Sequence, residues 1–361
     1  MKTLPIPQPG TSNYIVKIIY IVTFIFLSAY TAQAMNWGTT VRQDTVIKSK
    51  RQQMTLLKDM GLNTYRLDLT NASQFKSLKQ LIVEAKKKGI RIVPVLSLDC
   101  DLVSDTEEEL YVRAYNFARL TVNTFKADIH IWEMGNELEQ WAMARPGEQL
   151  DDGSTWSIYW GDAGGDSYND YIADRYNKVR GVIRGLCDGA HQADPKVQCI
   201  VNTAGWFHYA FLQRLTSDGV VFEITGYHWY SHYGDIENAY PDENGVGTNI
   251  AASLACMGKP IWITECGVYM GTADGDEAAH AKTLSDLIKN FTRIAPIYNI
   301  KSVSIYELFD EPYFIDPELS NFENFEAFMG IFHAVLDADG VTYNLGTPKP
   351  AYYAIKQLLN P

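Results

Sequence analysis

Two glutamates stand out because each follows a short apolar run of the chain. Glu137 comes two residues after the run at 129–135, and Glu265 ends the run at 260–265. Hydrolysis of a glycosidic bond needs two carboxyl groups: one gives a proton to the leaving oxygen, and the other, ionised, attacks the sugar or activates water. We therefore predict that Glu137 and Glu265 form a catalytic pair, provided that the fold brings them together.

The elements that must position this pair alternate regularly. Eight short runs rich in β-branched residues are predicted as strands, at residues 35–38, 64–69, 90–96, 129–135, 198–202, 222–228, 260–265 and 302–307. Segments with helical spacing lie between them, most clearly at residues 73–89, 107–126 and 277–294. Alternating strands and helices form parallel sheets. Eight such units predict an α/β fold, a closed (β/α)8 TIM barrel in a single domain.

An open, doubly wound sheet is the alternative arrangement of these elements. That fold normally carries a glycine-rich phosphate-binding turn after its first strand, and residues 36–40 are not such a turn. In a TIM barrel the C-terminal ends of the strands surround the active site. Glu137, after the fourth run, and Glu265, at the end of the seventh, are then expected at one rim.

Two connections are long, at residues 138–166 and 308–345. Structureless loops of this length are uncommon in a compact domain and usually serve function or are disordered. Both are rich in aromatic residues, which argues against disorder. Trp141, Trp156 and Trp160 fit either the core of the first loop or platforms for sugar rings.

Several motifs in the expected order resemble clan A of the glycoside hydrolases, a large set of retaining barrel enzymes that includes families 5 and 39. The resemblance covers residues 35 to 361. It rests on Asn136-Glu137 after the fourth strand and Glu265 ending the seventh, with the His-x-Tyr of His228 and Tyr230 on the sixth and Arg66 on the second. Residues 133–137 are similar to the acid/base segment of family 39, and residues 347–353 resemble the start of the clan's final helix.

The resemblance implies a role for each of these residues. Glu137 protonates the leaving group and then deprotonates water, while Glu265 attacks the anomeric carbon. Asn136 would hydrogen-bond the sugar 2-hydroxyl. Arg66 and Tyr230 would hold Glu265 in its anionic form. The remaining residues that we expect to bind substrate or support the site are His228, Trp37, Tyr306 and Glu307.

The chain departs from the clan's pattern at several positions. Gly135 stands where many members have tryptophan, and Leu138 where many have proline. Family 5 usually has a histidine at the end of strand three, where this chain has residues 97–99 (Ser-Leu-Asp). The tryptophan of strand eight that stacks under the sugar is replaced by Tyr306 or Phe309. These departures leave the family, and therefore the substrate, open.

Each candidate also has a purely structural interpretation. Glu137 and Glu265 would then be surface acids, Arg66 a brace of the barrel interior, and His228 a core histidine. Glu133 fits a buried structural acid better than a third catalyst. His228 and His232 mimic a metal pair, but a strand end without a third clustered histidine is a poor zinc site. Cys266 is expected to point away from Glu265 and to pack behind the site.

The net charge limits the partners that the protein can bind, and the first residues indicate where it is located. The formal net charge is −12, and we find no basic run that would suit nucleic acid or an anionic membrane. Lys2 and Lys17 precede the apolar stretch 18–29, and residues 31–34 are mostly small. This predicts a signal peptide over residues 1–34, cleaved after Ala34, and a secreted or periplasmic catalytic domain over 35–361 with no membrane contact. An uncleaved anchor is the alternative, although the stretch is short for one.

Five cysteines are an odd and sparse set for a secreted chain, so disulfides are not expected to be its main scaffold. Cys187 and Cys199 are spaced to pair across a helix-to-strand loop, but connectivity cannot be read from the sequence. No Cys-x-x-Cys pair is present, and we predict neither a metal nor another cofactor.

The main hypothesis is a retaining β-glycosidase that acts on a polysaccharide or oligosaccharide. A non-catalytic carbohydrate-binding envelope protein on the same scaffold is the alternative, and a metal-dependent barrel hydrolase is disfavoured by the seven scattered histidines. The sugar, the linkage, endo or exo attack, transglycosylation and the oligomeric state stay open.

Overall fold

The computed structural model describes residues 35–41, 49–159 and 161–360. Residues 34–361 form one compact unit. The predicted signal peptide and Trp160 lie outside the described residues. Within the described part of the chain, no helix is long and apolar enough to cross a membrane.

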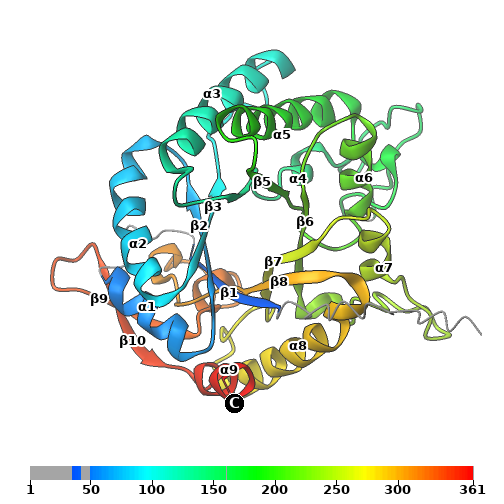
Figure 1. Ribbon diagram of the computed structural model, residues 1–361. Helices are drawn as coiled ribbons and strands as arrows, with labels where there is room; N and C mark the ends of the chain where they lie inside the picture. The colour runs from blue at the N-terminus through cyan, green and yellow to red at the C-terminus, as the bar shows by residue number, and fades with distance from the viewer. Residues whose placement is uncertain (1–34, 42–48, 160, 361) are drawn as a thin grey trace, which may run out of the picture. The chain divides into compact units, whose positions relative to one another are not determined.

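Eight parallel strands close into a barrel in the order of the chain, as predicted (Figure 1). They are β1 (Asn36–Val41), β2 (Thr64–Leu69), β3 (Arg91–Leu96), β4 (Ile131–Glu133), β5 (Gln198–Val201), β6 (Ile224–Tyr230), β7 (Ile261–Gly267) and β8 (Ile300–Ile305). Pairing of β1 with β8, for example Asn36 with Ser302, closes the ring. Each of the eight predicted runs overlaps one strand of the barrel, and the predicted TIM barrel is confirmed.

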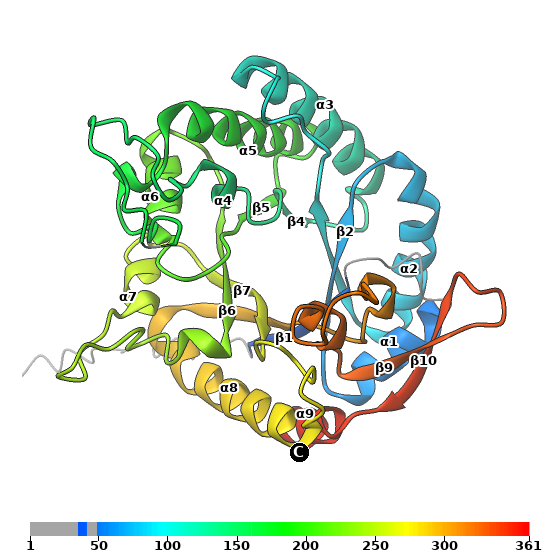
Figure 2. The ribbon, with the colours of Figure 1, turned by 180° about the vertical axis from the view of Figure 1, so that it is seen from behind.

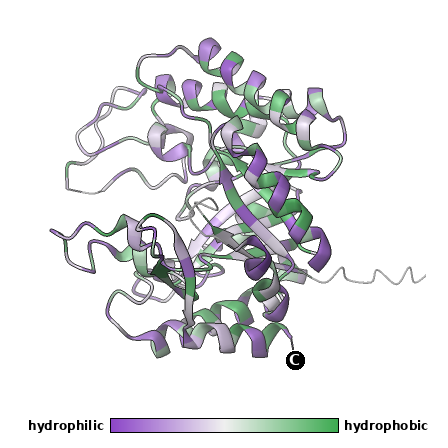
Figure 3. Cartoon of the chain, turned by 90° about the vertical axis from the view of Figure 1, so that its left-hand side faces the viewer, coloured by the Kyte–Doolittle hydropathy of each residue, from purple (hydrophilic) through white to green (hydrophobic). Residues whose placement is uncertain are grey.

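Helices surround the barrel (Figure 1). They are α1 (Lys50–Asp59), α2 (Phe75–Lys88), α3 (Glu107–Phe125), α4 (Glu139–Ala142), α5 (Ala173–Ala193), α6 (Tyr209–Ser217), α7 (Ile250–Ala255), α8 (Glu277–Tyr298) and α9 (Pro350–Leu359). Hydrophobic and hydrophilic residues alternate along them in Figure 3, as expected of helices with one face on a core.

Local signals explain where these helices begin and end. α3 starts at a capping box, in which Thr106 accepts from the Glu109 N–H and Glu109 accepts from the Thr106 N–H. α2 ends at Gly89, whose φ of 68° is the left-handed conformation that glycine adopts without a steric penalty. α5 approaches α3 so closely that a Cβ on Gly185 would lie 2.4 Å from the carbonyl oxygen of Tyr111.

The two long connections contain structure that the sequence did not predict. The first includes α4. The second, predicted as a loop over 308–345, contains β9 (Phe332–Leu336) and β10 (Tyr343–Pro348), which pair antiparallel outside the barrel. Figure 2 shows the segment before β9 coiled beside β1, where the Leu308 N–H donates to the Thr40 carbonyl (3.2 Å).

Strand four is shorter than predicted for a reason that matters to the site. The predicted run continues to Gly135, but β4 ends at Glu133. Gly135 (φ 85°) and Glu137 (φ 49°) both adopt left-handed backbone, which cannot continue a strand. The chain therefore turns at the point where Glu137 reaches the rim.

Candidate active site

The structure brings Glu137 and Glu265 together at the C-terminal ends of the strands. One carboxylate oxygen of each lies within 4.8 Å of the other and of a ring nitrogen of His228. Glu137 follows β4, whereas Glu265 and His228 lie within β7 and β6. Segments more than 90 residues apart in the sequence thus meet at one point, as the barrel requires.

Glu265 is held on both carboxylate oxygens. Arg66 Nη1 donates to Oε1 (2.8 Å), and the Tyr230 hydroxyl donates to Oε2 (2.6 Å). Burial and then the negative charge of Glu265 raise the pKa of Tyr230 well above its ordinary value, so the phenol keeps the proton that it donates. Both oxygens of the Glu265 carboxylate thus accept a hydrogen bond, one of them from a cation, and the carboxylate is fixed in one orientation.

Arg66 is buried and has acidic partners on two sides. Besides Glu265, its Nε donates to Glu133 Oε2 (2.5 Å). Burial by itself would lower the pKa of Arg66, but the charges of Glu133 and Glu265 outweigh burial and raise it. Glu133 is fully buried behind Arg66 and does not line the cavity.

Asn136 is oriented by the same guanidinium. Arg66 Nη2 donates to Asn136 Oδ1 (2.6 Å). Because the amide oxygen is occupied, the Asn136 amide N–H groups are the ones that remain to donate to a bound molecule.

Glu137 has a different environment from Glu265. His228 Nδ1 lies 2.6 Å from Glu137 Oε1, and Gln140 Nε2 donates to Oε2 (2.8 Å). The Glu137 side chain is 26% exposed and that of Glu265 only 8%. Glu137 can therefore exchange protons with solvent, and no arginine or lysine contacts it among the described residues.

His228 links the two carboxylates and is completely buried. Its Nδ1 also lies 3.4 Å from Glu265 Oε2. Burial disfavours the imidazolium, but the charge of Glu265, followed by the hydrogen bond and charge of Glu137, outweighs burial and raises the pKa of His228. Protonation of His228 is thus coupled to the charge of both glutamates.

Two supporting residues were missed by the sequence analysis. Asn202 accepts from the Glu137 N–H through Oδ1 (2.8 Å), and its Nδ2 donates to Glu133 and to the Gly135 carbonyl. Asn202 therefore stabilises the left-handed turn that presents Glu137. Asn202 ends the fifth predicted run, so the strand-end rule that selected Glu137 and Glu265 also pointed to Asn202. Gln140, in α4, had no such signal.

A cavity of about 360 Å³ opens over the pair. Its polar floor contains both glutamates, Arg66 and Asn136, and its walls carry Asp68, Glu326 and the aromatic residues Tyr230, Tyr233, Tyr269, Tyr306 and Phe325. The ring of Tyr306 meets that of Tyr230 edge-on, with 6.2 Å between centroids. A polar floor with aromatic walls suits a ligand that has hydroxyl groups and apolar faces.

Two residues predicted for the site lie elsewhere. Trp37 packs in the hydrophobic core. Thr40, near the end of the same strand, lines the cavity. Trp37 is three residues earlier, so its side chain is on the opposite face of the sheet and far from the rim. Glu307 is fully buried and is not among the residues that line the cavity. Its backbone joins the segment after β8, where the Ile331 N–H donates to the Glu307 carbonyl (2.9 Å).

The structure also shows where the residues of a possible metal site and the thiol of Cys266 lie. The described residues contain two groups with donor atoms close enough to hold a metal, Glu137–His228–Glu265 and His191–Cys199–Glu223, and neither includes His232. Arg66 already gives Glu265 a cationic partner, which disfavours a metal in the first group. Cys266 packs in the core behind Glu265, and burial raises the pKa of its thiol.

Comparisons with known proteins find relatives by structure only. No protein-family profile matches the chain, and no curated protein matches it. A GH10 endoxylanase from a sugarcane soil metagenome is 16% identical with a TM-score of 0.58, and the match covers 91% of this chain and 98% of that one. The Ignisphaera aggregans GH53 catalytic domain is 15% identical (TM-score 0.56, coverage 90% and 92%). The family 1 β-glucosidase from Thermotoga maritima is 11% identical (TM-score 0.57, coverage 90% and 97%). At these identities the likeness shows a common fold.

The coupling of His228 to Glu265 can be tested directly. In a Glu265→Gln variant the pKa of His228 should fall, because the largest influence that raises it is removed while burial remains. An NMR pH titration of the imidazole measures the shift. A Glu139→Gln variant, whose carboxylate contacts His208 instead (2.7 Å), serves as the control and should leave His228 unchanged. An unaltered titration of His228 in Glu265→Gln would refute the coupling.

Proposed function

We propose that the protein is a retaining O-glycosyl hydrolase of the clan A type that cleaves β-glycosidic bonds in a poly- or oligosaccharide. The observation that carries this proposal is the approach of the Glu137 and Glu265 carboxylates to within 4.8 Å. Retaining enzymes hold their two carboxyl groups about 5–5.5 Å apart, and inverting enzymes about 6.5–9.5 Å to admit a water molecule. The spacing therefore supports double displacement.

In the first step Glu265 attacks the anomeric carbon while Glu137 gives its proton to the glycosidic oxygen. The bond from the anomeric carbon to that oxygen breaks, the leaving sugar departs as an alcohol, and a glycosyl ester forms on Glu265. Arg66 and Tyr230 aim the two oxygens of Glu265, and Asn136 donates to the 2-hydroxyl of the reacting sugar.

In the second step Glu137, now ionised, takes a proton from water. The resulting hydroxide attacks the anomeric carbon, the ester bond to Glu265 breaks, and the product leaves with its original anomeric configuration. Glu137 is protonated again and Glu265 is again ionised. The greater exposure of Glu137 suits a group that must meet a water molecule at this stage.

The likeness to known structures supports the same class of reaction. The similar folds include proteins named as endoxylanases and a β-glucosidase. The residues that we assign to catalysis occupy the strand ends at which TIM barrels place active sites.

A second hollow, lined in part by Gln140, which donates to Glu137, favours a chain as the substrate. This groove, of about 680 Å³, shares Gln140, Ala204 and Tyr233 with the cavity over the pair. It is lined by Trp156, Trp206 and Phe207 together with polar residues. Because Glu137 protonates the leaving oxygen, the groove lies on the leaving-group side, and we assign it to the sugars that depart.

Trp206 is placed to stack on one of those sugars. Its side chain is 37% exposed, and its backbone has a left-handed φ of 52°. The ring lies 4.5 Å from that of Tyr240 and meets Tyr233 edge-on. A large aromatic residue held in an uncommon backbone conformation and left open to solvent indicates binding rather than core packing.

The charge of the two hollows favours a neutral sugar over an anionic one. Asp68 and Glu326 line the cavity, and Asp162 and Asp166 line the groove. Among the described residues that line the cavity, the one guanidinium is that of Arg66, and it already has Glu133 and Glu265 as partners. A uronic acid would meet net negative charge here. We further propose that residues 1–34 direct export and are removed after Ala34, so that hydrolysis takes place outside the cytoplasm.

Substitution of either glutamate should abolish hydrolysis. Glu137→Gln and Glu265→Gln remove the proton transfer and the nucleophile, so each should lower kcat on a natural saccharide by at least about 10²-fold. The measurement is product release from a panel of neutral β-glucans, mannans and xylans. Wild-type cleavage that persists in both variants would contradict the proposal, and binding without cleavage by the wild type would favour a non-catalytic carbohydrate-binding protein.

The groove makes a separate prediction about chain length. Trp206→Ala should lower kcat/KM on an oligosaccharide about tenfold, the effect of losing about 1.4 kcal/mol of stacking. Activity on an aryl glycoside with a small leaving group should be unchanged. Tyr159→Ala, an exposed aromatic residue that does not line the groove, is the matched control. Equal losses on both substrates would remove the groove from substrate binding.

A further inference from the structure

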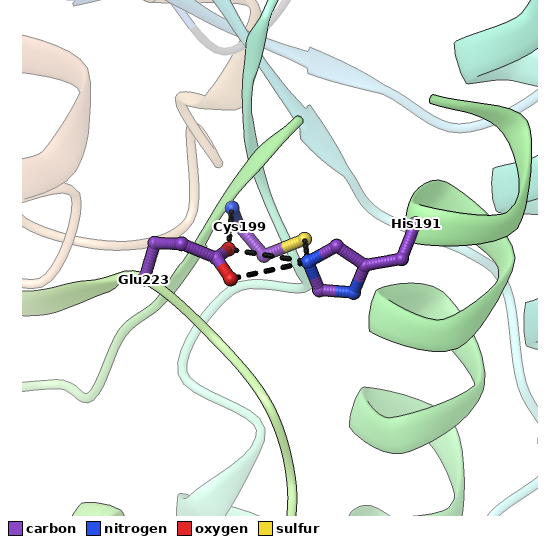
Figure 4. A group of neighbouring side chains, drawn as sticks. All are labelled: His191, Cys199 and Glu223. Atoms are coloured by element: carbon purple, nitrogen blue, oxygen red, sulfur yellow. Dashed lines mark hydrogen bonds and ion pairs between the residues drawn. The ribbon is translucent and has the colours of Figure 1, made fainter. Parts of the chain in front are cut away.

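A second cluster of reactive side chains lies at the opposite end of the barrel, where the parallel strands begin. His191 is in the last turn of α5, Cys199 is the second residue of β5, and Glu223 comes directly before β6. Figure 4 shows the three side chains pointing at one another from these separate segments. Nothing in the proposed hydrolysis uses them.

The donor atoms of the cluster are spaced like the ligands of a tetrahedral metal. His191 Nε2 lies 3.2 and 3.3 Å from the two oxygens of Glu223 and 3.8 Å from Cys199 Sγ. Zinc bonds of about 2.0–2.3 Å to nitrogen, oxygen and sulfur place tetrahedral ligands roughly 3.3–3.8 Å from one another. We propose that His191, Cys199 and Glu223 bind a zinc ion in a structural site.

Outer contacts orient two of the ligands for this role. The Cys199 N–H donates to Glu223 Oε2 (2.8 Å), which fixes the carboxylate. The main chain of Cys187, one turn earlier on α5, hydrogen-bonds the His191 ring. Since Nε2 faces Glu223 and Cys199, Nδ1 is the ring nitrogen that is left for this contact. A carbonyl on the far nitrogen is the usual arrangement of a metal-bound histidine.

The surroundings of the cluster offer the metal ion a fourth ligand and a route from solvent. The thiols of Cys187 and Cys199 are free, buried and within hydrogen-bonding reach of each other, so Cys187 or a water molecule completes the tetrahedron. The His191 and Glu223 side chains are 24% and 32% exposed, which gives a metal ion access to the buried sulfur.

Without the metal, the cluster is an ion pair beside a protonated thiol. The Glu223 carboxylate accepts a hydrogen bond from the His191 ring and so raises the pKa of His191. The hydrogen bond with Cys187, together with burial, raises the pKa of Cys199. Zinc would replace the protons of both groups and join α5, β5 and the start of β6 through one centre. The thiol, imidazole and carboxylate are all ligand types that zinc prefers.

The test uses the untagged full chain, stripped with a chelator in the presence of reductant. We expect it to take up one zinc ion per chain and to gain thermal stability. Cobalt(II) should give a near-ultraviolet thiolate-to-metal charge-transfer band. Because Glu137, His228 and Glu265 contain no sulfur, metal bound in the active site cannot produce that band.

Variants assign the band to this cluster. Cys199→Ser should abolish it, and His191→Gln and Glu223→Gln should weaken zinc binding at least about tenfold. Cys100→Ser, which removes a thiol after β3 at the opposite rim, is the matched control and should bind as the wild type does. Circular dichroism verifies folding, and Glu223→Gln, which keeps an acceptor for the Cys199 N–H, serves if Cys199→Ser does not fold.

Three outcomes would overturn the proposal. The first is that the wild type shows no thiolate band. The second is that the wild type binds zinc no more tightly than the three variants do, in which case the cluster is only an ion pair. Alternatively, titration of the protein purified without reductant finds Cys187 and Cys199 joined in a disulfide, which would withhold the sulfur from a metal. None of these results depends on hydrolysis by Glu137 and Glu265.

Discussion

The candidate active site depends on one buried cation. Arg66 lies inside the barrel with its guanidinium divided between Glu265, Glu133 and Asn136. A buried charge is tolerated only when it is paired and hydrogen-bonded, and Arg66 meets this requirement through Glu133 and Glu265, whose charges raise its pKa. The same planar group sets the direction of three side chains from β7, β4 and the turn after β4. Loss of Arg66 would therefore leave two buried carboxylates without their shared counter-charge, and the site would change as a whole.

The division of labour between the two glutamates follows from their surroundings. Glu265 is nearly buried between a guanidinium and a phenol, which both donate to its carboxylate and hold it in one orientation. Glu137 is presented on a left-handed turn that Asn202 stabilises, and its contacts are an imidazole and an amide. It is accessible to water, and no arginine or lysine of the described part of the chain contacts it, which suits a group that must give and recover a proton. His228 lies between them and responds to the charge of both. The different surroundings of Glu137 and Glu265 thus suit two chemically identical side chains to different roles.

Much of this arrangement could be predicted from the sequence, and the misses have physical causes. The barrel followed from eight regular runs, and the strand-end rule selected Glu137 and Glu265. Arg66, Asn136, His228 and Tyr230 were expected from the resemblance to clan A, and the structure brings all six residues together. Trp37 was placed at the rim because the first run was set too early; the strand extends to Val41, and it is Thr40 that reaches the cavity. The position of Gln140 depends on how the chain turns after β4. That turn could not be predicted, because Glu137 adopts left-handed backbone without being a glycine. The β9–β10 pair was missed because β10 includes Gly346 and Pro348, residues that are unfavourable in strands.

The central claim is that Glu265 becomes covalently attached to the sugar. A 2-deoxy-2-fluoro glycoside with a reactive leaving group slows both steps but slows the release of the ester most, so the intermediate accumulates. Inactivation of the enzyme with such a compound, followed by proteolysis and peptide mass spectrometry, locates the attached sugar. The account predicts that the added mass lies on Glu265. Attachment at any other residue, including Glu137 or Glu133, would contradict it.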